Sequence, residues 1–195
     1  MISVRRAHRG DAIDIAEVHV AAWRSAYPGI LPDRYLTNLS ITTQAAYYGA
    51  TLHGPTGVFV ATASGPDLPA ARASRSGNAS AIIGFATAGR SRTGGEIARH
   101  LAEGEIETLY VLDDWRERGI GRRLMGAAAA YLAQSGCRSV YLWVLRDNPS
   151  RWFYQRLGGK PTVEATIRFA GRNVPQTAFV WDPIERLLAA SPQES

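Results

Sequence analysis

The chain has 195 residues and a formal net charge of +5, with 22 basic and 17 acidic residues. Cys137 is the only cysteine, which excludes an internal disulfide and a thiolate cluster. We therefore expect no metal and a reducing, cytoplasmic setting. We expect no membrane insertion, because no run of about eighteen apolar residues occurs. We expect no nucleic-acid partner either, because the basic residues are scattered along the chain and form no dense block.

The N-terminal half predicts three strands and two helical stretches. Asp11 is placed to cap the first helix, which should stop before Pro28 because proline disrupts a helix interior. Residues 25–39 contain Pro and Gly and are predicted as a loop that leads into a shorter helical stretch. Residues 64–80 lack apolar periodicity and are rich in small residues, Pro and Arg, which predicts a mobile loop. The predicted strands are residues 2–8, 58–63 and 81–88.

The C-terminal half shows a sharper alternation of strands and helices. An amphipathic pattern predicts a helix over residues 122–134 that stops at Gly136. A short helix over residues 149–157 is capped by Asn148 or Asp147. The remaining predicted elements are strands at residues 105–112 and 139–145, a turn at 113–121 and a hairpin at 161–181. The chain is thus predicted to form one domain, residues 1–185, followed by a tail, residues 186–195.

A glycine-containing turn, Arg116-Glu117-Arg118-Gly119-Ile120-Gly121, joins a predicted strand to the long helix. Such a turn can aim several backbone N–H groups at one point, and the helix N-terminus adds the positive end of its dipole, so the turn suits a diphosphate. The glycines are needed because a Cβ there would block the anion or the required dihedral angles. The alternative is an ordinary strand-to-helix turn in which the glycines only relieve strain.

Two other phosphate-binding motifs do not fit this turn. A dinucleotide fingerprint would need a third glycine where Leu124 stands. A P-loop would need Gly-Lys followed by Ser or Thr, and the only lysine of the chain is Lys160. The turn is therefore predicted to bind a diphosphate through its backbone, with Arg118, Arg122 and Arg123 available for further phosphate oxygens.

Three motifs, in order and spacing, resemble those of the GNAT superfamily of N-acetyltransferases. Arg116, Gly119 and Gly121 match its glycine turn, the preceding strand ends in Leu-Tyr-Val, and Asn148 precedes a short helix with Phe-Tyr and a Leu-Gly ending. The resemblance implies an α/β fold with a mixed, mostly antiparallel sheet of about seven strands, flanked by about four helices. Its fourth and fifth strands would splay apart. Gly159 departs from the family, which usually has an aromatic residue there.

The resemblance implies acetyl-CoA as the acyl donor, with the pantetheine arm inserted between the splayed strands like an extra strand. The N–H of Val111 would then donate to the thioester carbonyl, where negative charge grows during attack. The residues implied in cofactor binding are Leu109, Tyr110, Val111, Arg116, Glu117, Arg118, Gly119, Ile120, Gly121, Arg122, Asn148 and Tyr154.

The resemblance also implies direct attack of an amine on the thioester. Because only about one aliphatic amine in a thousand is neutral near pH 7, a base is useful, and Glu105 stands where the superfamily's histone acetyltransferases carry a catalytic glutamate. Glu107 lies on the same strand face by the period-two rule and is the second candidate. A solvated carboxylate is the alternative for both. Tyr154 resembles the family tyrosine that protonates the leaving thiolate, with mere packing on the cofactor as its alternative.

The acceptor site is implied at the first two helices, their loop and the C-terminal hairpin. This points to Trp23, Tyr27 and Tyr35 and to residues 168–175, with Glu107 as a further substrate-binding residue. We expect a small-molecule primary amine as acceptor. The alternatives are a protein N-terminus or lysine, and a non-catalytic acyl-CoA-binding module. A homodimer is common in the superfamily, but the sequence does not decide it.

Overall fold

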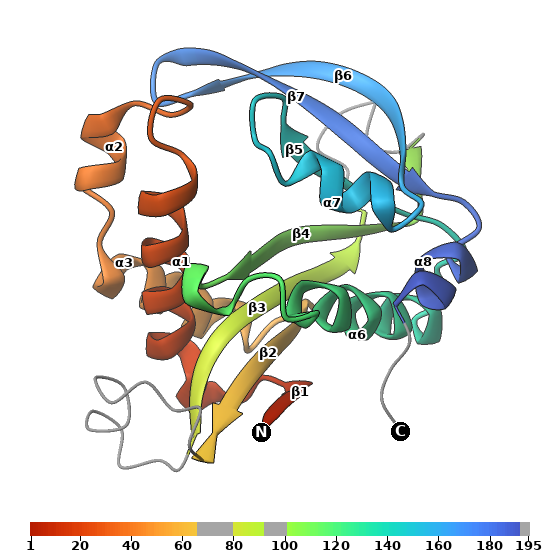
Figure 1. Cartoon of the computed structure of the whole chain (residues 1–195), viewed down its shortest axis with the longest axis horizontal. Helices are drawn as coiled ribbons and strands as arrows, with labels where there is room; N and C mark the ends of the chain where they lie inside the picture. Colours follow the sequence, from red (N-terminus) through yellow and green to blue (C-terminus); the bar gives the residue numbers. More distant parts are fainter. Residues whose placement is uncertain (66–79, 92–100, 192–195) are drawn as a thin grey trace.

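The computed structural model describes residues 1–65, 80–91 and 101–191. Its seven strands form one sheet in the order β1-β2-β3-β4-β5-β7-β6 (Figure 1). Neighbouring strands are antiparallel except β4 and β5, which run parallel, so the predicted mixed sheet is confirmed. The strands are β1 (Ile2–Arg6), β2 (Gly57–Ser64), β3 (Ser80–Arg90), β4 (Gly104–Val111), β5 (Val140–Leu145), β6 (Lys160–Phe169) and β7 (Arg172–Trp181).

Six α-helices lie in the described part of the chain, two more than the resemblance implied. α1 packs against α3, and α1 covers one face of the sheet over β3 and β4, whereas α6 covers the other face over β2 and β3 (Figure 1). The additional helices are α2, inside the predicted loop 25–39, and α8, in the predicted tail. The helices are α1 (Ala12–Ala26), α2 (Asp33–Thr37), α3 (Ile41–Thr51), α6 (Ile120–Gln134), α7 (Arg151–Arg156) and α8 (Glu185–Ala190).

The central strands supply two apolar cores from alternate side chains. On β2, Val58 and Val60 belong to the core beneath α1 and α3, while Phe59 and Ala61 belong to the core beneath α6. Both faces of the strand are therefore covered, which explains its continuous apolar sequence.

β4 and β5 are paired only where they begin. The parallel pairing covers residues 104–105 of β4 and 140–141 of β5. β4 then contains a bulge, in which Glu107 is an extra residue between the pairs that Ile106 and Thr108 make with β3. An extra residue bends a strand and increases its local twist. The bulge thus accounts for the divergence of β4 from β5, which the resemblance implied (Figure 1).

Helix α8 packs against α6, so the expectation of a tail from residue 186 is wrong as far as residue 191. Leu187 is fully buried. The carbonyl oxygen of Ser191 lies so close to Gly126 of α6 that a Cβ there would be 2.5 Å from it. The apolar residues that precede and form α8 recur at helical spacing, and this pattern was the sequence signal for the helix.

Gly159 leaves room for an aromatic ring that comes from another strand. A Cβ at Gly159 would lie 2.6 Å from the indole of Trp181 on β7. That indole donates a hydrogen bond from Nε1 to the carbonyl of Leu157 at 2.8 Å. The ring expected at residue 159 is thus replaced by one from β7, which ties the end of α7 to the sheet.

The predicted mobile loop, residues 64–80, falls largely on residues 66–79, which lie outside the described residues. None of the helices that the structure describes is both long enough and apolar enough to cross a membrane.

Gly126→Ala should lower the free energy of unfolding by about 1–3 kcal/mol, because the added methyl group forces Ser191 and α8 away from α6. Gly49→Ala in α3 is the matched control, since nothing lies within 4 Å of its Cβ position. The control should gain up to about 1 kcal/mol from helix propensity. Chemical denaturation of both variants measures the difference, and equal changes would contradict the docking of α8.

Candidate active site

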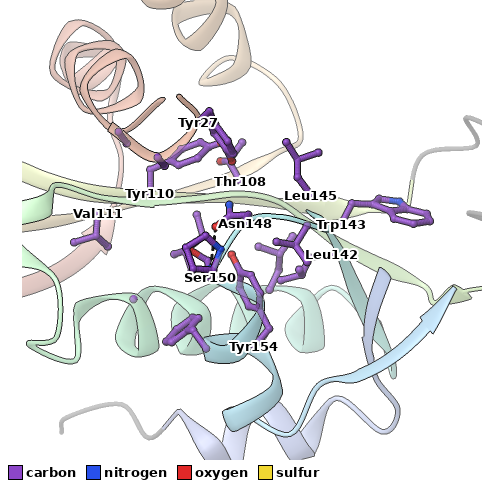
Figure 2. A pocket seen from close by; sticks show the side chains of 18 of the residues that line it. Tyr27, Thr108, Tyr110, Val111, Leu142, Trp143, Leu145, Asn148, Ser150 and Tyr154 are labelled. Atoms are coloured by element: carbon purple, nitrogen blue, oxygen red, sulfur yellow. Dashed lines mark hydrogen bonds between the residues drawn. The ribbon is translucent and has the colours of Figure 1, made fainter. Parts of the chain in front are cut away.

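A cavity of about 610 Å³ lies where β4 and β5 separate. Its lining residues come from α1, β4, the turn before α6, β5, α7 and the hairpin of β6 and β7. In Figure 2, Tyr110 on β4, Asn148 before α7 and Tyr154 on α7 all border it. Its volume is typical of sites for small molecules and cofactors. The separated strands therefore open the middle of the sheet to a ligand.

The turn before α6 forms one end of the cavity and offers unbonded backbone donors. Gly119, the N-cap residue of α6, has a φ of 75°, and Glu117 has a φ of 62°. Among the residues that the structure describes, none accepts a hydrogen bond from the backbone N–H groups of residues 117–122. The positive end of the α6 dipole lies at the same place. Such a cluster of donors suits an anion, and residues 117–122 are called the anion site below.

Arginine side chains strengthen the positive potential at this end. Arg116, Arg122 and Arg156 line the cavity. Arg116 forms an ion pair with Asp113 at 2.7 Å, and Nε of Arg122 donates to the carbonyl of Ala190 in α8. The turn and α8 therefore hold two of these guanidinium groups beside the backbone donors.

All but one of the predicted cofactor-binding residues line the cavity. The exception is Arg118, whose guanidinium stacks on the ring of Trp115, 4.9 Å from its centroid. The others are Leu109, Tyr110, Val111, Arg116, Glu117, Gly119, Ile120, Gly121, Arg122, Asn148 and Tyr154.

Helix α7 is positioned by a local hydrogen bond and by close packing on the turn. Oδ1 of Asn148 accepts a hydrogen bond from the N–H of Ser150, the N-cap residue, at 2.9 Å (Figure 2). Phe153 packs on Gly121, where a Cβ would lie 3.3 Å from its ring. The absence of a side chain at Gly121 thus lets α7 approach the anion site. Both Phe153 and the next residue, Tyr154, line the cavity.

Tyr154 is a buried phenol that keeps its proton. Burial, and secondarily the nearby phenol of Tyr27, raise the pKa of Tyr154 far above its ordinary value of 10. At neutral pH its hydroxyl is therefore a hydrogen-bond donor inside the cavity.

The two candidate bases occupy different places. Glu107, the bulge residue, lines the cavity, whereas Glu105 is not part of its lining. Oε2 of Glu105 accepts a hydrogen bond from the Tyr141 phenol at 2.8 Å, where β4 and β5 are still paired. The two carboxylates therefore differ in their position along β4, with Glu105 where the strands are paired and Glu107 at the bulge where they part.

A second wall of the cavity is aromatic. Trp23 and Tyr27 line it as expected, together with Tyr110 from β4 and Phe169 from β6. Trp23 is the centre of this group, with its ring centroid 5.0 Å from that of Tyr27 and 5.9 Å from that of Phe169. Tyr35 does not line the cavity but packs edge-on against Phe169 at 4.7 Å.

Further lining residues went unpredicted, although most of them adjoin segments that the sequence had already linked to the site. Ser150, Phe153 and Arg156 lie in the segment of Asn148 and Tyr154, whereas Trp143 on β5 reaches the cavity only through tertiary structure. Alternation along β6 was a further signal, since Ile167 and Phe169 share a face of that strand. The unpredicted residues include Leu31, Trp143, Ser150, Phe153, Arg156, Ile167 and Gln176.

His19 lies behind the aromatic wall and is uncharged near pH 7. Its ring stacks on Trp23 with 4.9 Å between the centroids and 17° between the planes. Its Nδ1 lies 2.7 Å from the hydroxyl of Tyr48. Burial lowers the pKa of His19 to about 4. The wall therefore has no positive charge from His19 behind it.

The comparisons with known proteins agree with this geometry. Residues 22–159 match the acetyltransferase (GNAT) family. The chain is 30% identical over 188 residues to the uncharacterized N-acetyltransferase YuaI of Bacillus subtilis (strain 168), and the match covers 96% of each protein. The chain therefore belongs to the acetyltransferase (GNAT) family and is an acetyl-CoA-dependent enzyme.

Solved structures share the fold at low sequence identity. One is yncA, a putative acetyltransferase from Salmonella typhimurium with acetyl-CoA, with a TM-score of 0.64 and 19% identity over 93% of this chain and 94% of that one. Another is Arabidopsis thaliana NAA60 in complex with a bisubstrate analogue, with a TM-score of 0.62 and 21% identity over 93% and 98%. These matches confirm the fold class.

His19→Asn should make stability less dependent on pH between about 6.5 and 4. The unfolded chain protonates His19 below its ordinary pKa of 6.5, whereas the folded chain does so only near 4. The unfolded state thus binds more protons in this window, so up to about 3 kcal/mol of stability present above pH 6.5 is lost as pH falls. Denaturation at several pH values measures the difference, and identical pH slopes in variant and wild type would contradict it.

Proposed function

We propose that this acetyltransferase transfers the acetyl group of acetyl-CoA directly to the primary amine of a small molecule. One observation carries the proposal: a single cavity is bordered by the anion site of residues 117–122, by Tyr154 and by Glu107. Direct transfer needs the donor, the amine and the groups that handle protons in one place.

The cavity offers groups for the diphosphate and the pantetheine arm of acetyl-CoA, which supplies an activated acyl thioester when bound. The N–H groups of residues 117–122, with Arg116 and Arg122, would hold the diphosphate. The unpaired edge of β4 at residues 109–111 would bind the pantetheine arm as a strand binds its neighbour, and Asn148 borders the same space.

Val111 offers the backbone donor for the thioester oxygen. The next residue, Leu112, donates its N–H to the carbonyl of Ile83 on β3 at 2.9 Å. Successive N–H groups of a strand point to opposite edges. The N–H of Val111 is therefore expected to point away from β3, toward the gap beside β5, where it can stabilise the charge that grows on the oxygen.

Glu107 is the base we propose, acting on the ammonium group directly or through a water molecule. It lines the cavity, which Glu105 does not. Only about one aliphatic amine in a thousand is neutral near pH 7, so a carboxylate that accepts the proton raises the share of reactive amine. Glu105, favoured from the sequence, remains the second candidate.

Tyr154 is proposed to donate a hydrogen bond to the leaving sulfur. Its raised pKa keeps the proton on the phenol oxygen, and full transfer to a thiolate with a pKa of about 8.5 would be unfavourable. The residue therefore stabilises the charge that develops on sulfur while the proton of the amine leaves by way of the base.

Cys137 supports direct transfer by its position. It is buried, does not line the cavity, and burial raises the pKa of its thiol. A relay through an acyl-cysteine would need a reactive thiolate beside the donor.

A small acceptor is favoured because the hairpin closes on the region of α1 and α2. Phe169 of β6 packs on Tyr35 of α2, and Val174 of β7 joins the apolar cluster that contains Leu31 and Leu36. Figure 1 shows the turn of this hairpin beside the loop between α1 and α2. An extended peptide would need this side to be open.

Tyr154→Phe should lower kcat by about tenfold or more while the affinity for acetyl-CoA changes little, because only the hydrogen bond to the developing charge is lost. Release of CoA thiol with a panel of small amines and peptides gives kcat, and calorimetry gives the affinity. Unchanged turnover would remove Tyr154 from the reaction. Faster turnover of peptides than of small amines would contradict the small acceptor.

Glu107→Gln should lower kcat/KM by about a hundredfold and flatten its rise with pH, because the base is lost without a change in size. Glu105→Gln is the matched control on the same strand and should change kcat/KM by less than about threefold. Thiol release measured across a pH series gives kcat/KM for both variants. A larger loss of kcat/KM in Glu105→Gln than in Glu107→Gln would show that Glu105 is the base.

A further inference from the structure

We propose that the acceptor is a monoamine that carries an apolar ring and a neutral oxygen, and that Nε1 of Trp23 donates a hydrogen bond to that oxygen. This inference rests on the proposed function and narrows its substrate. Three independent features of the cavity support it: the distribution of charge, the aromatic wall and one unsatisfied donor.

Charge is unevenly distributed around the cavity. The arginines of the lining belong to the turn, α6 and α7. Within the described ranges, the lining residues of α1 and its following loop, β4, β5 and the hairpin include one charged side chain, Glu107. One carboxylate matches one ammonium group. A polyamine or an aminoglycoside would bring further cations without a partner, at a large desolvation cost.

The aromatic wall is held rigid by rings behind it. His19 stacks on Trp23 at 4.9 Å, and Tyr35 packs on Phe169 at 4.7 Å. Trp23 and Phe169 in turn lie 5.9 Å apart and both line the cavity. A preformed apolar surface loses little entropy when a ring packs on it. This side of the cavity therefore favours a flat apolar group over a polar or flexible one.

Nε1 of Trp23 is a buried donor with no acceptor at normal hydrogen-bond distance among the residues that the structure describes. The phenol of Tyr110 is the nearby group that it influences, since burial raises the pKa of Tyr110 and Trp23 acts to lower it. A buried N–H without an acceptor costs free energy that a bound oxygen would recover. Since Trp23 also lines the cavity, the acceptor molecule is a source of that oxygen. A carbonyl or hydroxyl fits better than a carboxylate, because the carboxylate of Glu107 lines the same cavity.

Calorimetric titration of the enzyme–CoA complex with three amines tests this recognition. L-Phenylalaninamide has one amine, a ring and a carbonyl; 2-phenylethylamine lacks the carbonyl; spermidine is a polycation without a ring. We expect phenylalaninamide to bind about tenfold or more tightly than spermidine, because spermidine leaves buried cations unpaired. Equal or tighter binding of spermidine, or no binding of phenylalaninamide at millimolar concentration, would overturn the proposal.

The hydrogen bond has its own variant. Trp23→Phe should lower the affinity for phenylalaninamide about fivefold more than it lowers the affinity for 2-phenylethylamine, because only the first amine has an oxygen to accept the hydrogen bond. The matched control is Trp152→Phe, since Trp152 is exposed and lies outside the cavity lining; it should change neither affinity. The same loss for both amines in Trp23→Phe would overturn the hydrogen bond.

Thiol release with the same amines separates this inference from the proposed function. Tight binding of phenylalaninamide without its acetylation would support the recognition and contradict the function. Preferential acetylation of spermidine would support an amine acetyltransferase and overturn the recognition.

Discussion

The separation of two neighbouring strands is the constraint on which the site depends. β4 and β5 pair over two residues and then part at the bulge of Glu107. Parting exposes backbone N–H and C=O groups that a closed sheet would consume, and such groups need a partner. A ligand with an amide-bearing arm can be that partner. The same bulge places a carboxylate beside the opening, so one backbone irregularity provides both the binding edge and the proposed base.

The two ends of the cavity differ in the physical interactions that they offer to a ligand. The end at the α6 N-terminus works by backbone dipoles and guanidinium groups, which suit an anion and tolerate variation in side chains. The end at α1 and the hairpin works by aromatic surface and a single carboxylate. The first end is built from a short stretch of sequence, whereas the second is assembled from distant segments. The first end therefore depends on local sequence, and the second depends on the tertiary fold.

The sequence predicted what local residues determine. The glycine turn, its helix and the short helix after Asn148 are contiguous motifs, and all three stand where they were expected. The stacking of the Arg118 side chain on Trp115 was not expected, because it depends on a rotamer that no motif specifies. Glu105 was preferred to Glu107 because it stands where the superfamily's histone acetyltransferases carry a glutamate, and the sequence does not reveal the bulge at Glu107. Phe169 lies within residues 168–175, which were expected at the acceptor site. Trp143 on β5 was not predicted, because only the tertiary fold brings it to the cavity.

Helix α8 connects the end of the described chain to the anion site. It packs along α6, and its Ala190 carbonyl accepts from Arg122 in the first turn of that helix. A truncation or fusion that displaces α8 would therefore release the Arg122 side chain, which lines the cavity, as well as weaken the fold. Any shortened or tagged form of the enzyme should therefore keep residues through Ser191 intact.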